Sequence, residues 1–179
     1  MTDLGVPEAP AELQATILQV FEPLGWIVSA LRREPESAEY AAWVFEVNGA
    51  EVRFRQARTT PAKAGQFVTI WARVPAGPIR PFDMADPVAL FIVSVCSGEE
   101  AGQFVFSKVE LQRQGVVSRD GIGGKRAIRV YPPWDVAPNR HAQRSQAWQS
   151  EFFLGFREAG VSDHARAKAL YASISDNIP

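Results

Sequence analysis

The sequence contains very little cysteine, and this scarcity narrows its chemistry. Cys96 is the only cysteine among 179 residues, so no disulfide can form within the chain and no site can be built from several cysteines. Because residues 92–95 read as a strand, we expect Cys96 to be a small buried core residue and not a reactive thiol. His141 and His164 have no partner at triad or metal spacing and are expected at the surface.

Long apolar runs are absent too. No stretch approaches the ~20 apolar residues that a helix needs to cross a bilayer, and residues 1–5 lack the basic, apolar character of a secretory signal. We therefore expect a cytoplasmic protein without a membrane partner. A hydrophobic fraction of 46% suits one sizeable core, and we expect residues 1–179 to form a single domain.

The net charge is only −1, but it conceals segments of alternating sign. Residues 1–49 hold two Lys/Arg against eight Asp/Glu, and residues 81–102 hold none against four. Residues 50–80 hold six Lys/Arg against one Asp/Glu, and residues 103–149 hold eight against three. Such segments either pair with each other or, when the positive ones share a face, form a basic patch that attracts phosphates.

A β-hairpin is the clearest local feature. Asn48-Gly49 tolerates positive φ at both turn positions and favours a two-residue type I′ turn between strands in residues 40–47 and 50–58. The apolar core face then carries Trp43, Phe45, Val47, Val52 and Phe54. The other face, wet or ligand-facing, carries Glu46, Glu51, Arg53 and Arg55, with Glu46 opposite Glu51.

The remaining segments predict a mixed α/β (α+β) fold. Apolar spacing near 3.6 predicts helices over residues 11–21, 109–114 and 139–156, and a last helix capped by Ser162. Strand patterns cover residues 65–74, 88–96, 102–108 and 125–131, and 88–96 is apolar enough to be buried on both faces. We predict a central, largely antiparallel sheet of about six strands, flanked by an N-terminal helix and C-terminal helices.

Several unusual phrases stand in a fixed order along this part of the chain. They are Ala57-Arg58-Thr59-Thr60-Pro61, Trp71-Ala72-Arg73, Pro81-Phe82-Asp83, Gly102 to Lys108 and Arg129-Val130-Tyr131-Pro132-Pro133-Trp134-Asp135. Over about residues 40–153 the chain thereby resembles the MepB family, which has no settled biochemical activity. The resemblance implies a restriction-endonuclease-like core, and this analogy makes nucleic acid the expected ligand.

Nuclease chemistry is the first possibility that the resemblance raises. Enzymes with such a core hold Mg²⁺ on acidic residues and place a Lys two positions after one of them, but the sequence contains no Asp/Glu-x-Lys. The candidate remnants of a site are Glu46, Glu51, Gln56 and Arg58. Opposed carboxylates invite a metal or a cation, whereas Gln is a poor Mg²⁺ ligand and Arg stays protonated. We predict a degenerate, non-cleaving site with no cofactor, and Mg²⁺ only if the protein is a nuclease.

Basic residues gather where the predicted strands begin and end, which is where binding sites usually lie. The candidates for nucleic-acid contacts are Arg58, Lys63, Arg73, Lys108, Lys125, Arg126, Arg129 and Arg144. If they share one groove, the expected partner is nucleic acid, duplex DNA above all, bound without sequence preference. The alternatives are a protein- or small-molecule-binding module associated with drug response and an active Mg²⁺-dependent nuclease. Trp134 is interpreted as a core residue in preference to a base-stacking platform.

Overall fold

One large sheet, sheet A, organises the part of the chain that the computed structural model describes, namely residues 9–157, 160–161 and 163–175. Its strands in spatial order are β1 (Val28–Arg33), β2 (Trp43–Val47), β3 (Ala50–Gln56), β8 (Leu90–Ser97), β9 (Glu100–Ser107), β11 (Phe153–Arg157) and β12 (Gly160–Val161). Neighbours are antiparallel except β3 and β8, which run parallel. The predicted mixed fold with a large, largely antiparallel sheet is confirmed, with seven strands.

The predicted hairpin is confirmed in turn and register. Asn48 and Gly49 have φ of 51° and 81°, as a type I′ turn requires, and Glu46 lies opposite Glu51. Trp43, Phe45, Val47, Val52 and Phe54 are buried on one face.

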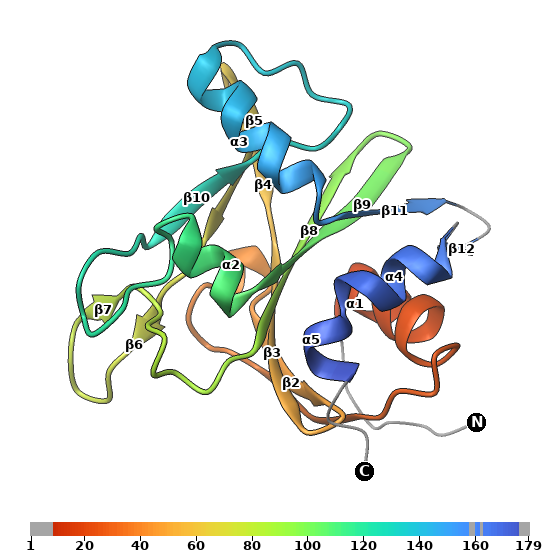
Figure 1. The fold of residues 1–179 in the computed structure, drawn as a ribbon, viewed down its shortest axis with the longest axis horizontal. Coiled ribbons are helices and arrows are strands. Elements are labelled where there is room, and N and C mark those ends of the chain that lie inside the picture. Colours follow the sequence, from red (N-terminus) through yellow and green to blue (C-terminus); the bar gives the residue numbers. More distant parts are fainter. Residues whose placement is uncertain (1–8, 158–159, 162, 176–179) are drawn as a thin grey trace.

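Two layers cover the two faces of sheet A (Figure 1). On one side lie α1 (Ala11–Thr16), its π-helical continuation η1 (Ile17–Phe21), α4 (His164–Leu170) and α5 (Ala172–Ser175). On the other lie α2 (Lys108–Arg113), α3 (Arg140–Ser150) and two small sheets. Strand β8 serves both cores, because Leu90 and Ile92 face the helical layer while Phe91, Val93 and Val95 face the other. The continuous apolar sequence of β8 is therefore explained by burial on both faces, as predicted.

The small sheets build the outer layer. Sheet B has the order β10 (Ala127–Val130), β5 (Lys63–Thr69) and β4 (Arg58–Thr60), and sheet C pairs β6 (Ala72–Arg73) with β7 (Ile79–Arg80). A 3-10 turn, η2 (Ala38–Tyr40), connects β1 to β2. None of the helices within the described ranges is long and apolar enough to cross a bilayer.

The structure corrects the predicted helix over residues 139–156. The helix ends at Ser150, and residues 153–157 form β11, which pairs with β9. The aromatic spacing that suggested one helix face instead places Phe153 directly over Gly102, where a Cβ would lie 2.3 Å from the ring. Sheet pairing therefore overrides the helical period.

Three further expectations change. The strand predicted over residues 65–74 is divided between β5 and β6, in different sheets. Cys96 is exposed, because the β8–β9 hairpin extends beyond the layers that cover it (Figure 1). Arg55, expected on a wet face, is only 3% exposed, because the outer layer covers that face. The Ser162 cap lies outside the described residues, and Asp163 caps α4 by accepting a hydrogen bond from the Arg166 N–H.

Candidate nucleic-acid interface

The outer face of sheet B places two cations on either side of an aromatic ring. In the register, Arg129 of β10 and Arg58 of β4 both lie opposite Phe67 of β5. Residues opposite each other in a ladder point to the same face, so the three side chains form one rung. Ile128 and Val130 point the other way into the core. The alternation of β5 and β10 therefore turns charge outward and apolar groups inward.

Phe67 is a partly buried ring with neighbours on this face. The Cζ atom of Arg129 lies 6.0 Å from its centroid, and the Tyr40 ring lies at 6.1 Å with an interplanar angle of 59°. Burial raises the pKa of Tyr40, Glu39 raises it further, and the charge of Arg58 lowers it. Arg58 and Arg129 thus act on the same small aromatic cluster.

Arg129 is held in one orientation. Its Nη1 donates to the carbonyl oxygens of Ala64 and Gly65 at 3.1 and 3.2 Å, and its Nη2 donates to Thr60 Oγ1 at 2.9 Å. Gly65 has φ of 73°, and a Cβ there would lie 2.8 Å from the Tyr131 ring, so glycine allows β5 to approach β10. The guanidinium is therefore pre-positioned.

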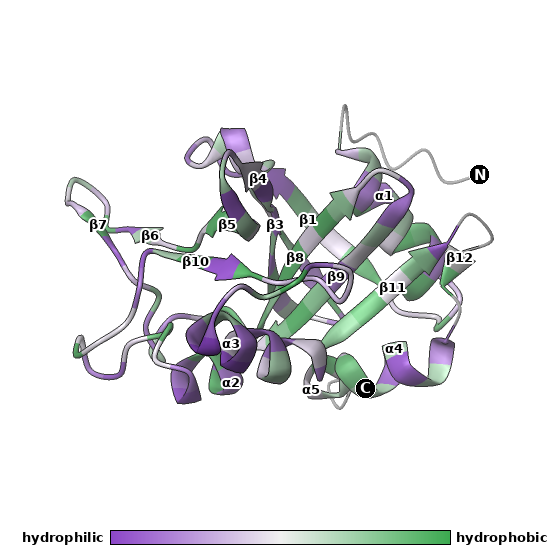
Figure 2. Ribbon diagram, turned by 90° about the horizontal axis from the view of Figure 1, so that it is seen from above, coloured by the Kyte–Doolittle hydropathy of each residue, from purple (hydrophilic) through white to green (hydrophobic). Residues whose placement is uncertain are grey.

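A hollow of about 380 Å³ continues this surface between β10 and α3. Its lining includes Lys125, Arg129, His141, Arg144 and Trp148, and no lining residue is acidic. Arg129 belongs to both the hollow and the outer face of sheet B. Figure 2 shows that α3, which borders the hollow, is largely hydrophilic.

Helix α3 is fixed to β10 by the buried amide of Gln149. Its Nε2 donates to the Arg129 carbonyl at 3.1 Å and its Oε1 accepts from the Tyr131 N–H at 2.8 Å. Asn139 caps the other end by accepting from the Ala142 N–H. The position of Arg144 relative to Arg129 is therefore determined by the fold.

We call the outer face of sheet B together with the hollow the basic face. It brings together most of the cations proposed from the sequence: Arg58, Lys63, Lys125, Arg129 and Arg144. Arg126 is exposed in the segment between Lys125 and β10. Within the described part of the chain no carboxylate forms an ion pair with any of these cations. All but Arg129 are exposed. The charge of the exposed side chains is therefore available to a ligand, whereas Arg129 is already bound to two carbonyls and to Thr60.

Two of the proposed cations have other roles. Lys108 donates through Nζ to the carbonyls of Met84 and Asp86 at 3.0 and 2.7 Å, which fixes the loop before β8. Arg73 forms an ion pair with Glu36 in a separate cavity. The position of a cation at the end of a predicted strand therefore does not show whether it is free for a ligand or bonded within the protein.

The candidate remnants of a nuclease site do not form one cluster. Glu51 accepts from Arg53, and Glu46 lies beside Ser29. Gln56 lies on the opposite face of β3 and donates to Glu12 of α1 at 2.9 Å, while Arg58 belongs to sheet B. No group of three or more His, Cys, Asp or Glu side chains is placed to hold a metal ion in the described ranges.

Sequence reasoning missed Phe67 and Tyr40 as parts of this surface. Alternation along the sequence was not a sufficient signal, because the β4–β5 ladder shifts register between Thr59 and Thr60 and Gly65 has a positive φ. Trp134, interpreted as a core residue, is half-buried and packs edge-on against Phe153 at 5.8 Å, at the margin of the core between sheet A and the outer layer.

The fold and the site define a mixed α+β protein with a large sheet and one basic face. The chain belongs to the MepB-like family, whose model matches residues 34–155. A solved structure titled "Crystal Structure of MepB" is similar, with 31% sequence identity and a TM-score of 0.68, over 72% of this chain and 86% of that chain. No curated protein matches the chain.

Proposed function

We propose that this protein binds nucleic acid through the basic face. One observation carries the proposal: cations from separate segments, Arg58 and Lys63 on one side of Phe67 and Lys125 and Arg144 beyond Arg129, share a surface whose hollow has no acidic lining residue. Unpaired arginines and lysines are the groups that neutralise phosphates.

The expected ligand is duplex DNA, bound without sequence preference. The cations lie on a sheet face and around a hollow, where they can follow a phosphate backbone, and phosphate contacts carry no sequence information. The half-buried rings of Phe67 and Tyr40 add a surface on which an unpaired base could stack. The restriction-endonuclease-like core that the family resemblance implies points to the same ligand by analogy.

We also propose that binding is not followed by cleavage. Glu46 and Glu51 lie opposite each other, but Glu51 is engaged by Arg53 and Gln56 lies on the other face of β3, so the four remnants do not form one site that could hold Mg²⁺ and activate water. We expect no Mg²⁺-dependent cutting of DNA or RNA in a gel assay. Efficient cutting that is lost in Glu46→Ala or Glu51→Ala would contradict this. The expected compartment is the cytoplasm, where an exposed free thiol such as Cys96 stays reduced.

The binding test is a fluorescence-polarisation titration of labelled duplex DNA at several salt concentrations. With about four to six phosphate contacts, the slope of log affinity against log salt is about −4 to −5. Unrelated duplex sequences should give the same affinity. Absence of binding to duplex or single strands at low salt would contradict the proposal.

Charge reversal locates the binding surface. The double variant Lys125→Glu/Arg126→Glu should weaken binding to all DNA sequences alike. It should also reduce the magnitude of the salt slope by about two. The matched control is Arg157→Glu/Lys168→Glu, because both side chains are exposed but lie on β11 and α4, away from the basic face. Equal weakening by the two double variants would show that only net charge matters.

A further inference from the structure

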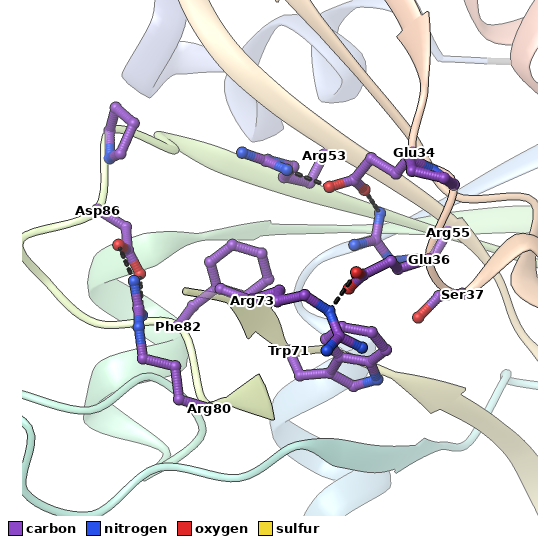
Figure 3. Close-up of a pocket in the computed structure, with 13 residues that line it drawn as sticks. Glu34, Glu36, Ser37, Arg53, Arg55, Trp71, Arg73, Arg80, Phe82 and Asp86 are labelled. Carbon is purple, nitrogen blue, oxygen red and sulfur yellow. Dashed lines mark hydrogen bonds and ion pairs between the residues drawn. The ribbon is translucent and has the colours of Figure 1, made fainter. Parts of the chain in front are cut away.

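A second cavity, of about 290 Å³, opens beside β3 and gathers four arginines: Arg53, Arg55, Arg73 and Arg80 (Figure 3). We call it the arginine cavity. Its walls include the rings of Trp71 and Phe82. A volume near the lower end of the usual ligand range suits a small molecule, because pockets for drug-sized ligands measure about 300–1,000 Å³.

Arg55 lines this cavity and has one N–H group without a hydrogen-bond partner among the described residues. The residue is 3% exposed, its Nη1 donates to the Phe54 carbonyl, and it pairs with Glu34. Its Nε is buried and has no acceptor among the described residues. Burial lowers the pKa of Arg55, and Glu34 opposes that shift. A buried N–H without an acceptor is costly, and a ligand oxygen in the cavity would satisfy it.

The arginines of the cavity already bind carboxylate groups of the chain itself. Arg80 holds Asp86 through two bonds of 2.8 and 2.7 Å, and Glu34 lies between Arg53 and Arg55. Arg73 pairs with Glu36 through Nε, and its Cζ lies 5.6 Å from the Trp71 centroid. Guanidinium groups stacked on aromatic rings present flat forks that match carboxylates and phosphates.

One of the internal carboxylates is suited to exchange. Glu34 and Glu36 both belong to the loop after β1, but Glu34 is bound to two arginines whereas Glu36 is bound to Arg73 alone. The side chains of Arg73 and Glu36 are 47% and 34% exposed. An exposed ion pair of this kind contributes little to stability, so an incoming anion can replace Glu36 at small cost.

We propose that the arginine cavity binds a small molecule with a phosphate or carboxylate group attached to a flat apolar ring. Arg55 and Arg73 take the oxyanion, and Trp71 takes the ring. Without ligand, Glu36 occupies the place of the anion on Arg73. This site is separate from the basic face, and the proposal does not depend on nucleic-acid binding.

Isothermal titration calorimetry with phenyl phosphate, benzoate, inorganic phosphate and phenol tests the assignment. Phenyl phosphate should bind more tightly than inorganic phosphate, and phenol should not bind, because the anion and the ring both contribute. Binding of phenyl phosphate without benzoate identifies phosphate as the preferred anion, and the reverse identifies carboxylate. Absence of binding by both would overturn the proposal.

Two variants of the exposed pair give opposite results. Arg73→Gln should weaken phenyl phosphate binding about tenfold, the effect of losing one charged hydrogen-bond donor. Glu36→Gln should strengthen it severalfold, because Arg73 then has no internal carboxylate. Both side chains are partly exposed, so both variants should keep the circular dichroism spectrum of the parent. Weaker binding in Glu36→Gln would overturn the proposal.

Lys125→Gln is the matched control, because it removes a cation from the basic face. It should leave phenyl phosphate binding unchanged while weakening the binding of duplex DNA. Equal loss of phenyl phosphate binding in Lys125→Gln and Arg73→Gln would show that binding depends on the overall charge of the protein and not on the arginine cavity, and would overturn the proposal. Failure of DNA binding with phenyl phosphate binding intact would affect only the proposed nucleic-acid function.

Discussion

The arginine cavity and the basic face lie on the same side of sheet A, but their cations differ in what surrounds them. In the cavity each arginine has a carboxylate partner: Glu34 and Glu51, Glu36, or Asp86. On the basic face the described residues provide none. Both sets include residues from the positive segment 50–80. The net charge of a segment therefore does not show which of its charges are available to a ligand.

The largest expected effect concerns the buried pair of the cavity. Glu34→Gln should lower the free energy of unfolding by about 3–5 kcal/mol, because Arg55 would stay buried without a carboxylate. Urea denaturation followed by fluorescence measures the loss. The matched variant Glu36→Gln should cost at most about 1 kcal/mol, because its partner Arg73 is exposed. Equal effects would mean that burial does not separate the two ion pairs.

The aromatic ring of the basic face should give the next largest effect. Phe67→Ala should weaken single-stranded DNA binding by about 1–3 kcal/mol, the typical contribution of one stacked base, and leave the salt slope unchanged. Lys63→Ala should instead reduce the magnitude of the salt slope by about one. Fluorescence polarisation at several salt concentrations separates the two. A change of slope in Phe67→Ala would show that the ring acts by positioning Arg129.

Asp83 joins the loop before β8 to residues 118–121 and should give a smaller, pH-dependent effect. Its carboxylate accepts hydrogen bonds from the Ser118 hydroxyl and the N–H groups of Ala85 and Gly121, and these lower its pKa to about 2. Because the pKa is lowered on folding, the stabilisation is complete above the unfolded value and is lost as the pH falls toward about 2.

Asp83→Asn should therefore lower the melting temperature at pH 7, and the difference from the parent should shrink as the pH falls below 4. Differential scanning calorimetry across this range measures it. A difference that stays constant with pH would assign the effect to the shape of the loop and not to the charge.

The smallest effect should come from Lys108. Since its Nζ is engaged by two backbone carbonyls, Lys108→Gln should leave both DNA affinity and salt slope unchanged, whereas Lys125→Gln should weaken binding. The same titration compares the two. Loss of affinity in Lys108→Gln would extend the basic face toward α2.

Features that depend on interactions between residues near each other in the sequence were predictable. The type I′ turn at Asn48-Gly49 determines the register of its hairpin, and the continuous apolar run of β8 requires cover on both faces. Gly115 follows α2 with φ of 71°, in the left-handed region that glycine favours at the end of a helix. The burial of Arg55 was not predictable, because β5 and its neighbours, which cover that face, follow later in the chain. The strand β11 was missed because its partner β9 is remote in sequence.

The sequence by itself determined where the cations stand along the chain and the absence of Asp/Glu-x-Lys. Only the tertiary structure decided which cations stay free. Glu34 meets Arg55 because β1 and β3 both pair with β2, in registers that bring the end of β1 close to Arg55, whereas no acidic side chain lines the hollow that receives Lys125 and Arg144. Pairing of charges depends on distance in space, and the fold sets that distance.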